Sequence, residues 1–194
     1  MLAVSLLVGA GSTAVSAAPT PLPLSARLIK PGEFVFSPSG KPTRYASAKA
    51  WVGPPSFGFT AAQTAAETAS LRIDGFKSTL LESLGSHAGI SWVMELASPA
   101  SARAALATTF HYSTLPVGGV KLLATFSDPA VPGSRGYEVS GHGSHGQNIL
   151  FADGPFLYLL GDGWLNGSTN PPTRFALLAG LTRLYKRVHG HPAE

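Results

Sequence analysis

Residues 149–160 read ILFADGPFLYLL, and this stretch decides the fold. Two continuously apolar runs, 149–152 and 156–160, meet at Asp153-Gly154, a strong signal for a tight turn between antiparallel strands. Strands that are apolar without alternation are usually covered on both faces. The stretch therefore predicts a β-hairpin at the centre of a sheet, covered at least in part on each side.

Helix start signals occur at three places along the chain. Thr60 and Gln63 have the spacing of a capping box, which predicts a helix over 61–72. Ser98-Pro99 predicts an N-cap followed by proline in the first helical turn. A last helix is expected to start near 171–172, because an apolar stripe at helical spacing follows.

The remaining strands are indicated by short apolar runs between turn residues. Four segments besides the central hairpin are expected to be strands: 76–83, 90–97, 122–126 and 137–140. Residues 161–170, which contain Trp164, are expected to form a polar, glycine-rich loop. Hairpin-linked strands with few crossovers indicate an α+β fold, in which about five to six antiparallel strands carry two to three helices packed mainly on one face.

The chain divides into three parts. Residues 1–17 are almost wholly apolar and small, and they predict a signal peptide cleaved after Ala17. No Lys or Arg precedes Arg27, so an uncleaved membrane anchor is the alternative. Residues 18–59 are expected to be a Pro/Gly-rich, basic lead segment packing on the core, and 60–194 the α+β domain. The protein is therefore expected to be secreted or located in the cell envelope.

Composition excludes several classes of site. The chain has no cysteine, which excludes disulfides, thiolate metal sites and a lipid anchor attached through cysteine. Its net charge is +4, and much of the basic charge lies in the lead segment. Lys41, Arg44 and Lys49 are candidates for peripheral contact with an anionic envelope, although solvated loop charges are the simpler interpretation. No basic helix or reader motif is present, so nucleic-acid binding is not expected.

The glycine-rich segment 141–146, GHGSHG, matches the spacing of a dinucleotide-binding fingerprint. That fingerprint requires a following helix, whereas the residues after 146 predict a strand, so neither this site nor any other cofactor is expected. His142 and His145 are candidate metal ligands, but two imidazoles need a third ligand. The candidates for it are His87, His111 and Asp153.

No catalytic residue is assigned. The serine-hydrolase pattern G-x-S-x-G is absent, although a dispersed Ser/His/acid site has no sequence signature. Carboxylates that could form a glycosidase-type pair are Glu82, Glu95, Asp153 and Asp162. The candidate ligand-binding residues are the aromatic side chains of Trp164, Tyr158 and Trp92, with Trp164 favoured because an aromatic ring in a polar loop can stack on a ligand.

The order of segments from Gly75 onward resembles a group of actinobacterial exported domains with a PsbP-like fold, found in surface lipoproteins and kinase sensor domains. The resemblance lies in turn and core residues: Asp74-Gly75-Phe76, Ala97–Arg103, Val131–Gly136, Asn148–Phe151 with Asp153-Gly154, and Leu184–Val188. It implies an antiparallel sheet with flanking helices and no common catalytic residues.

Three functions are consistent with these features. The leading hypothesis is an exported, non-enzymatic domain that binds a small ligand or a protein partner at the cell envelope. The alternatives are a secreted hydrolase with a dispersed site and a structural protein associated with the envelope.

Overall fold

The computed structural model describes residues 19–52, 60–85, 89–116, 118–168 and 171–192. The predicted signal peptide, 1–17, and its cleavage site after Ala17 lie outside these residues, as does His87.

The described residues form one antiparallel sheet of seven strands, in the order β1-β2-β3-β7-β6-β5-β4. The strands are β1 (Thr43–Tyr45), β2 (Ser78–Leu84), β3 (Gly89–Glu95), β4 (Lys121–Phe126), β5 (Arg135–Gly141), β6 (Ser144–Asp153) and β7 (Phe156–Leu165). The α+β class and the antiparallel sheet are confirmed. The sheet is larger than expected because the lead segment adds β1 beside β2.

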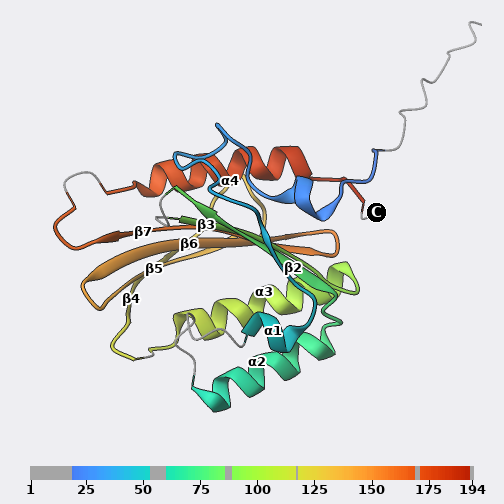
Figure 1. Ribbon diagram of the computed structural model, residues 1–194, viewed down its shortest axis with the longest axis horizontal. Helices are drawn as coiled ribbons and strands as arrows, with labels where there is room; N and C mark the ends of the chain where they lie inside the picture. The colour runs from blue at the N-terminus through green and yellow to red at the C-terminus, as the bar shows by residue number, and fades with distance from the viewer. Residues whose placement is uncertain (1–18, 53–59, 86–88, 117, 169–170, 193–194) are drawn as a thin grey trace, which may run out of the picture.

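Four α-helices cover the two faces of the sheet: α1 (Ala48–Val52), α2 (Ala61–Ile73), α3 (Pro99–Thr114) and α4 (Arg174–Val188). Figure 1 shows α1, α2 and α3 on one face and α4 on the other, together with the first part of the lead segment and its short 3-10 helix η1 (Leu24–Arg27). The expected one-sided helix layer therefore describes α1–α3 but not α4. Because the central strands are apolar on both faces, each face needs its own cover.

The central hairpin is β6-β7, as predicted, and it is buried on both sides. Asp153 pairs with Phe156 across a two-residue turn, Gly154-Pro155. Along β7, Phe156, Tyr158 and Leu160 belong to the core beneath α4, whereas Leu157 and Leu159 belong to the core beneath α3. This period of two, with apolar residues at every position, produces the continuous apolar run in the sequence.

Local signals determine two of the helix starts. The Thr60–Gln63 capping box is present at the start of α2. Ser98 caps α3 by accepting a hydrogen bond from the Ser101 backbone N–H at 3.1 Å. By contrast, α4 begins at Arg174 and is capped by Thr173, a little after the expected start near 171–172.

The lead segment is tied down by two arginines. Arg27 is fully buried, and its guanidinium donates to the Tyr158 hydroxyl at 3.0 Å and lies 3.8 Å from the centre of the Phe156 ring. Arg187 of α4 pairs with Glu33 at 2.6 Å. These contacts hold residues 24–36 across the α4 side of the sheet.

The expected loop at 161–170 begins with strand residues, and most of the glycine-rich segment 141–146 also lies in strands. Only His142 and Gly143, with φ of 50° and 76°, form the turn between β5 and β6. β7 continues to Leu165, so Trp164 lies in a strand and not in a loop. The glycines favoured a loop for 161–170. At Gly161, however, the missing side chain leaves room for Asn148, because a Cβ at this position would lie 2.1 Å from Asn148 Oδ1. A strand, and not a helix, follows this turn, as predicted.

Candidate functional site

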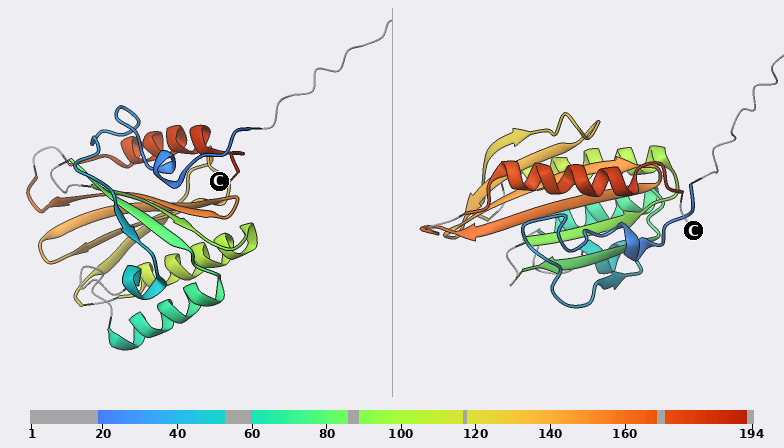
Figure 2. Two further views of the ribbon diagram at one scale, coloured as in Figure 1. Left: turned by 45° about the vertical axis from the view of Figure 1, so that its right-hand side comes forward. Right: turned by 90° about the horizontal axis from the view of Figure 1, so that it is seen from above.

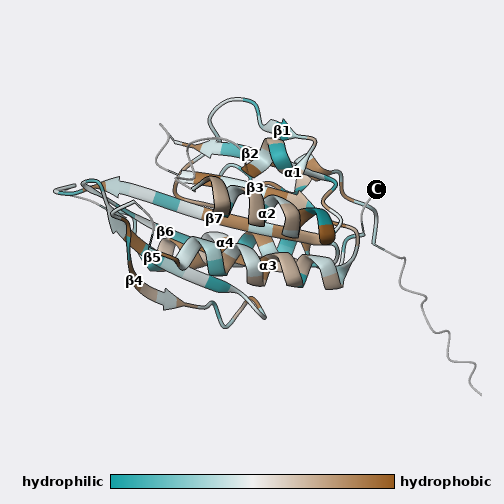
Figure 3. Cartoon of the chain, turned by 90° about the horizontal axis from the view of Figure 1, so that it is seen from below, coloured by the Kyte–Doolittle hydropathy of each residue, from teal (hydrophilic) through white to brown (hydrophobic). Residues whose placement is uncertain are grey.

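The ends of β5, β6 and β7 project beyond the first turn of α4. Figures 1 and 2 show these strand ends extending past the helix, on the side away from the chain termini. In Figure 3 the centre of β7 is hydrophobic, whereas its projecting end is pale with hydrophilic segments. The change of composition coincides with the place where the helix no longer covers the strands.

A row of three polar side chains crosses the sheet at this point. Glu138 of β5 is in register with Gln147 of β6, and Gln147 is in register with Asp162 of β7. Gln147 shares its face with Ile149, and Asp162 shares its face with Leu160, both of which pack beneath α4. Because side chains alternate along a strand, all three polar groups face the α4 side. We call Glu138, Gln147 and Asp162 the polar row.

Asp162 is the unusual member of the polar row. It is 5% exposed, and neither of its carboxylate oxygens has a hydrogen-bond partner among the described residues. Burial and, to a smaller extent, the negative charge of Glu138 together raise the pKa of Asp162 to about 7. A buried carboxyl group without a partner is energetically unfavourable. A ligand that formed hydrogen bonds to Asp162 would lower this free-energy cost.

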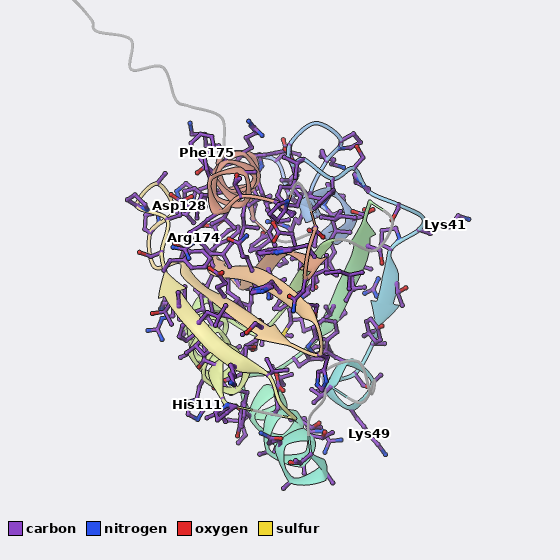
Figure 4. The ribbon with its side chains drawn as sticks, turned by 90° about the vertical axis from the view of Figure 1, so that its left-hand side faces the viewer. Lys41, Lys49, His111, Asp128, Arg174 and Phe175 are labelled. Carbon is purple, nitrogen blue, oxygen red and sulfur yellow. The ribbon has the colours of Figure 1, made fainter. Side chains whose placement is uncertain are left out.

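The other two members of the row have partners at the start of α4. Arg174 donates to Glu138 at 2.7 Å and lies 4.5 Å from the centre of the Phe126 ring. The Gln147 side-chain amide donates to the Pro172 carbonyl at 3.3 Å. Figure 4 shows Arg174 on the sheet side of α4 and Phe175 on its outer side, where Phe175 is 82% exposed.

The sheet brings two of the predicted site residues together. His145 and Trp164 are cross-strand partners, and their rings stack with centroids 5.5 Å apart and an interplanar angle of 7°. They lie two positions further along from Gln147 and Asp162 on the same strands, and therefore on the same face. Both are half-buried. We call His145 and Trp164 the aromatic pair, and the polar row, the aromatic pair and Arg174 together form the candidate site.

The remaining predicted residues lie elsewhere. Tyr158 is fully buried beneath α4, where its hydroxyl contacts Arg27. Trp92 is 3% exposed, lies on the opposite face of the sheet and packs edge-on against Trp51. His142 is exposed in the β5-β6 turn. Ligand binding by Tyr158 and Trp92 stays a prediction.

Metal binding by His142 and His145 also stays a prediction. Among the described residues, no group of three His, Asp or Glu side chains is placed to hold a metal ion. His111 lies in α3, and Asp153 pairs with His189 at 2.7 Å at the opposite end of β6.

The carboxylates considered from the sequence do not gather at one place. Asp162 belongs to the candidate site, Asp153 lies at the far end of the hairpin, and Glu95 pairs with Lys77 at 2.9 Å. Glu138, Gln147 and Arg174 were not predicted from the sequence. Once β5 and β6 are aligned, their alternation with core residues would have identified Glu138 and Gln147; nothing local marks Arg174.

The three basic residues of the lead segment do not form one cluster. Lys41 precedes β1, Arg44 lies in β1 and Lys49 lies in α1. Figure 4 shows Lys41 and Lys49 on separate parts of the surface. The Arg44 guanidinium lies 3.3 Å from Ser78 Oγ. Contact with an anionic envelope stays a prediction.

Comparison with known proteins identifies the fold. No known protein family matches the sequence, and no curated protein matches it. A solved structure with a similar fold is the extracellular domain of PknH from Mycobacterium tuberculosis, with a TM-score of 0.54 and 14% sequence identity. The match covers 84% of this chain and 94% of that one. At this identity the likeness concerns the fold alone.

Among the described residues, no helix is long and apolar enough to cross a membrane.

Proposed function

We propose that this chain is an exported, non-enzymatic domain that binds a small polar ligand at the cell envelope, and that the ligand binds at the candidate site. The proposal is supported by one observation above all: Asp162 is buried with both carboxylate oxygens unpartnered, directly beside the half-buried aromatic pair. A few convergent polar groups next to an aromatic surface are typical of ligand sites.

The likeness to the extracellular domain of PknH agrees with this proposal, because that domain lies outside the cell. Export by the predicted signal peptide and release after Ala17 are part of the same proposal. The PsbP-like resemblance stays a prediction.

The test uses the three tryptophans as reporters. A library of small polar compounds is added to ¹⁵N-labelled protein, and the indole N–H signals and the Gln147 side-chain amide are followed by NMR. A ligand of the candidate site is expected to shift Trp164 and Gln147 and to leave Trp51 and Trp92 unchanged, since both lie in the core on the opposite face. Hits that shift Trp92 but not Trp164 would contradict the proposal.

A specific observation also favours hydrolysis as a second candidate function. Glu138 and Asp162 are carboxyl groups on one face, and burial holds the pKa of Asp162 near 7 while Glu138 pairs with Arg174. Carboxyl groups in contrasting environments can serve as general acid and base. Release of nitrophenol from nitrophenyl glycosides that is abolished by Asp162→Asn would support this function; no turnover would leave ligand binding as the function.

A further inference from the structure

The charges around Asp162 specify the class of ligand. The candidate site contains two carboxyl groups and one permanent cation, Arg174, which is engaged by Glu138 at 2.7 Å. No hydrogen bond or ion pair joins Asp162 to a basic side chain in the part of the chain that the structure describes. When Asp162 is ionised, its charge and that of Glu138 exceed the charge of Arg174 by one negative charge.

The position of the acidic groups limits where a ligand cation would lie. Glu138 and Asp162 lie two strands apart in the same row, so their backbones are separated by about 10 Å. Gln147 lies between them, and its amide is directed to Pro172. A cation in contact with Asp162 therefore lies within about 10 Å of Glu138 and is attracted by both carboxylates.

The aromatic pair distinguishes an organic cation from a metal ion. Trp164 lies two residues beyond Asp162 on the same face, about 7 Å along the strand. An indole ring can contact the carbon skeleton of a ligand and attract its cationic group through the ring face. A hard metal ion would instead need several oxygen ligands, and among the described residues no group of three His, Asp or Glu side chains is placed to hold one.

We propose that the ligand of the candidate site is a small organic cation with a primary ammonium group, which donates hydrogen bonds to Asp162 and places its carbon skeleton on Trp164. The ammonium group has three donors, and Asp162 offers two unused oxygens. This inference rests on the proposed function and adds the chemical class of the ligand.

The experiment compares two probes of nearly the same shape. Cyclohexylammonium and cyclohexanol are titrated into the protein at pH 8, and the Trp164 indole and Gln147 amide signals are followed by NMR. Cyclohexylammonium is expected to bind at least about tenfold more tightly than cyclohexanol. Equal affinity, tighter binding of cyclohexanol, or the same signal changes with calcium chloride alone would overturn the proposal.

Two variants locate the effect, and a third is the control. Asp162→Asn and Glu138→Gln are each expected to weaken cyclohexylammonium binding about tenfold. Asp153→Asn is the matched control, because Asp153 lies on the same strand pair and face but pairs with His189 at the other end. Unchanged binding in Asp162→Asn, with thermal unfolding showing a folded protein, would refute the assignment.

Failure of this inference is separable from failure of the proposed function. If neutral polar compounds shift Trp164 and amines do not, the candidate site binds ligands but the cation assignment is wrong. If neither probe nor any library compound shifts Trp164, both proposals are wrong.

Discussion

Asp162 lies directly opposite Gln147 in the β6-β7 pairing, yet the Gln147 amide donates to the Pro172 carbonyl and leaves both oxygens of Asp162 without a partner. A buried carboxyl group in this situation retains its proton to a higher pH than in the unfolded chain. The same arrangement therefore affects stability as well as binding.

Asp162→Asn is expected to stabilise the protein at high pH. Between about pH 4 and pH 7 the folded protein holds a proton on Asp162 that the unfolded chain has released, because burial raises the pKa of this group to about 7. The free energy of unfolding therefore falls as pH rises through this window, by as much as about 4 kcal/mol. The variant should match the wild type at pH 4 and exceed it at pH 8 in urea unfolding. A variant that is less stable at pH 8 would contradict this assignment.

Glu67→Gln is also expected to raise the free energy of unfolding at high pH, independently of Asp162→Asn. Glu67 of α2 is 4% exposed, its Oε2 has no partner among the described residues, and burial raises its pKa to about 7. The gain at pH 8 should be about 3 kcal/mol at most. Because Glu67 and Asp162 lie on opposite sides of the sheet, the double variant should equal the sum within about 0.5 kcal/mol. Glu95→Gln, at an exposed ion pair, is the control and should change stability little.

Arg27→Ala is expected to destabilise the protein by about 3 kcal/mol. The substitution removes the hydrogen bonds to Tyr158 and to the carbonyls of Leu22 and His191, and it opens a cavity above Phe156. Urea unfolding measures the loss, and Arg103→Ala at an exposed position of α3 is the control. Equal stability of the two variants would show that the lead segment docks without Arg27.

Two tryptophan substitutions separate core from site. Trp92→Ala should lower the free energy of unfolding by about 3–5 kcal/mol, because Trp92 is 3% exposed within the α3-side core. Trp164→Ala should lower it by only about 1 kcal/mol, because Trp164 is half-buried, while reducing cyclohexylammonium binding. The reverse order of stability effects would place Trp164 in the core instead.

His142→Asn is expected to stabilise the β5-β6 turn by about 0.5–1 kcal/mol. His142 has a φ of 50°, and Asn followed by Gly is the preferred pair for a turn with positive φ at both positions. Thermal unfolding provides the measurement. The same substitution at His145 removes its stack on Trp164 and should give no gain; equal gains at the two positions would contradict a turn-specific effect.

The features that the sequence predicted correctly depend on neighbours in the chain. The Thr60–Gln63 capping box, the Ser98 cap and the Asp153-Gly154 signal each act within a few residues, so propensity and turn chemistry determine them. The burial of β6-β7 on both faces was also predicted from the sequence, because the residues on both faces of each strand are apolar. The loop predicted around Gly161 and Gly163 was wrong, because glycine favours a loop locally but here allows a strand to continue beside neighbours such as Asn148.

The sequence by itself determined the class of fold, the central hairpin, the starts of α2 and α3 and the absence of cysteine chemistry, because these follow from composition and short-range patterns. Only the tertiary structure decided that α4 covers the second face, that β1 of the lead segment pairs with β2 at the edge of the sheet, and that Glu138, Gln147 and Asp162 form one row. Which face a polar side chain occupies depends on the register between strands that are distant in the chain. The lack of a partner for Asp162 depends in turn on which donors that register brings near it.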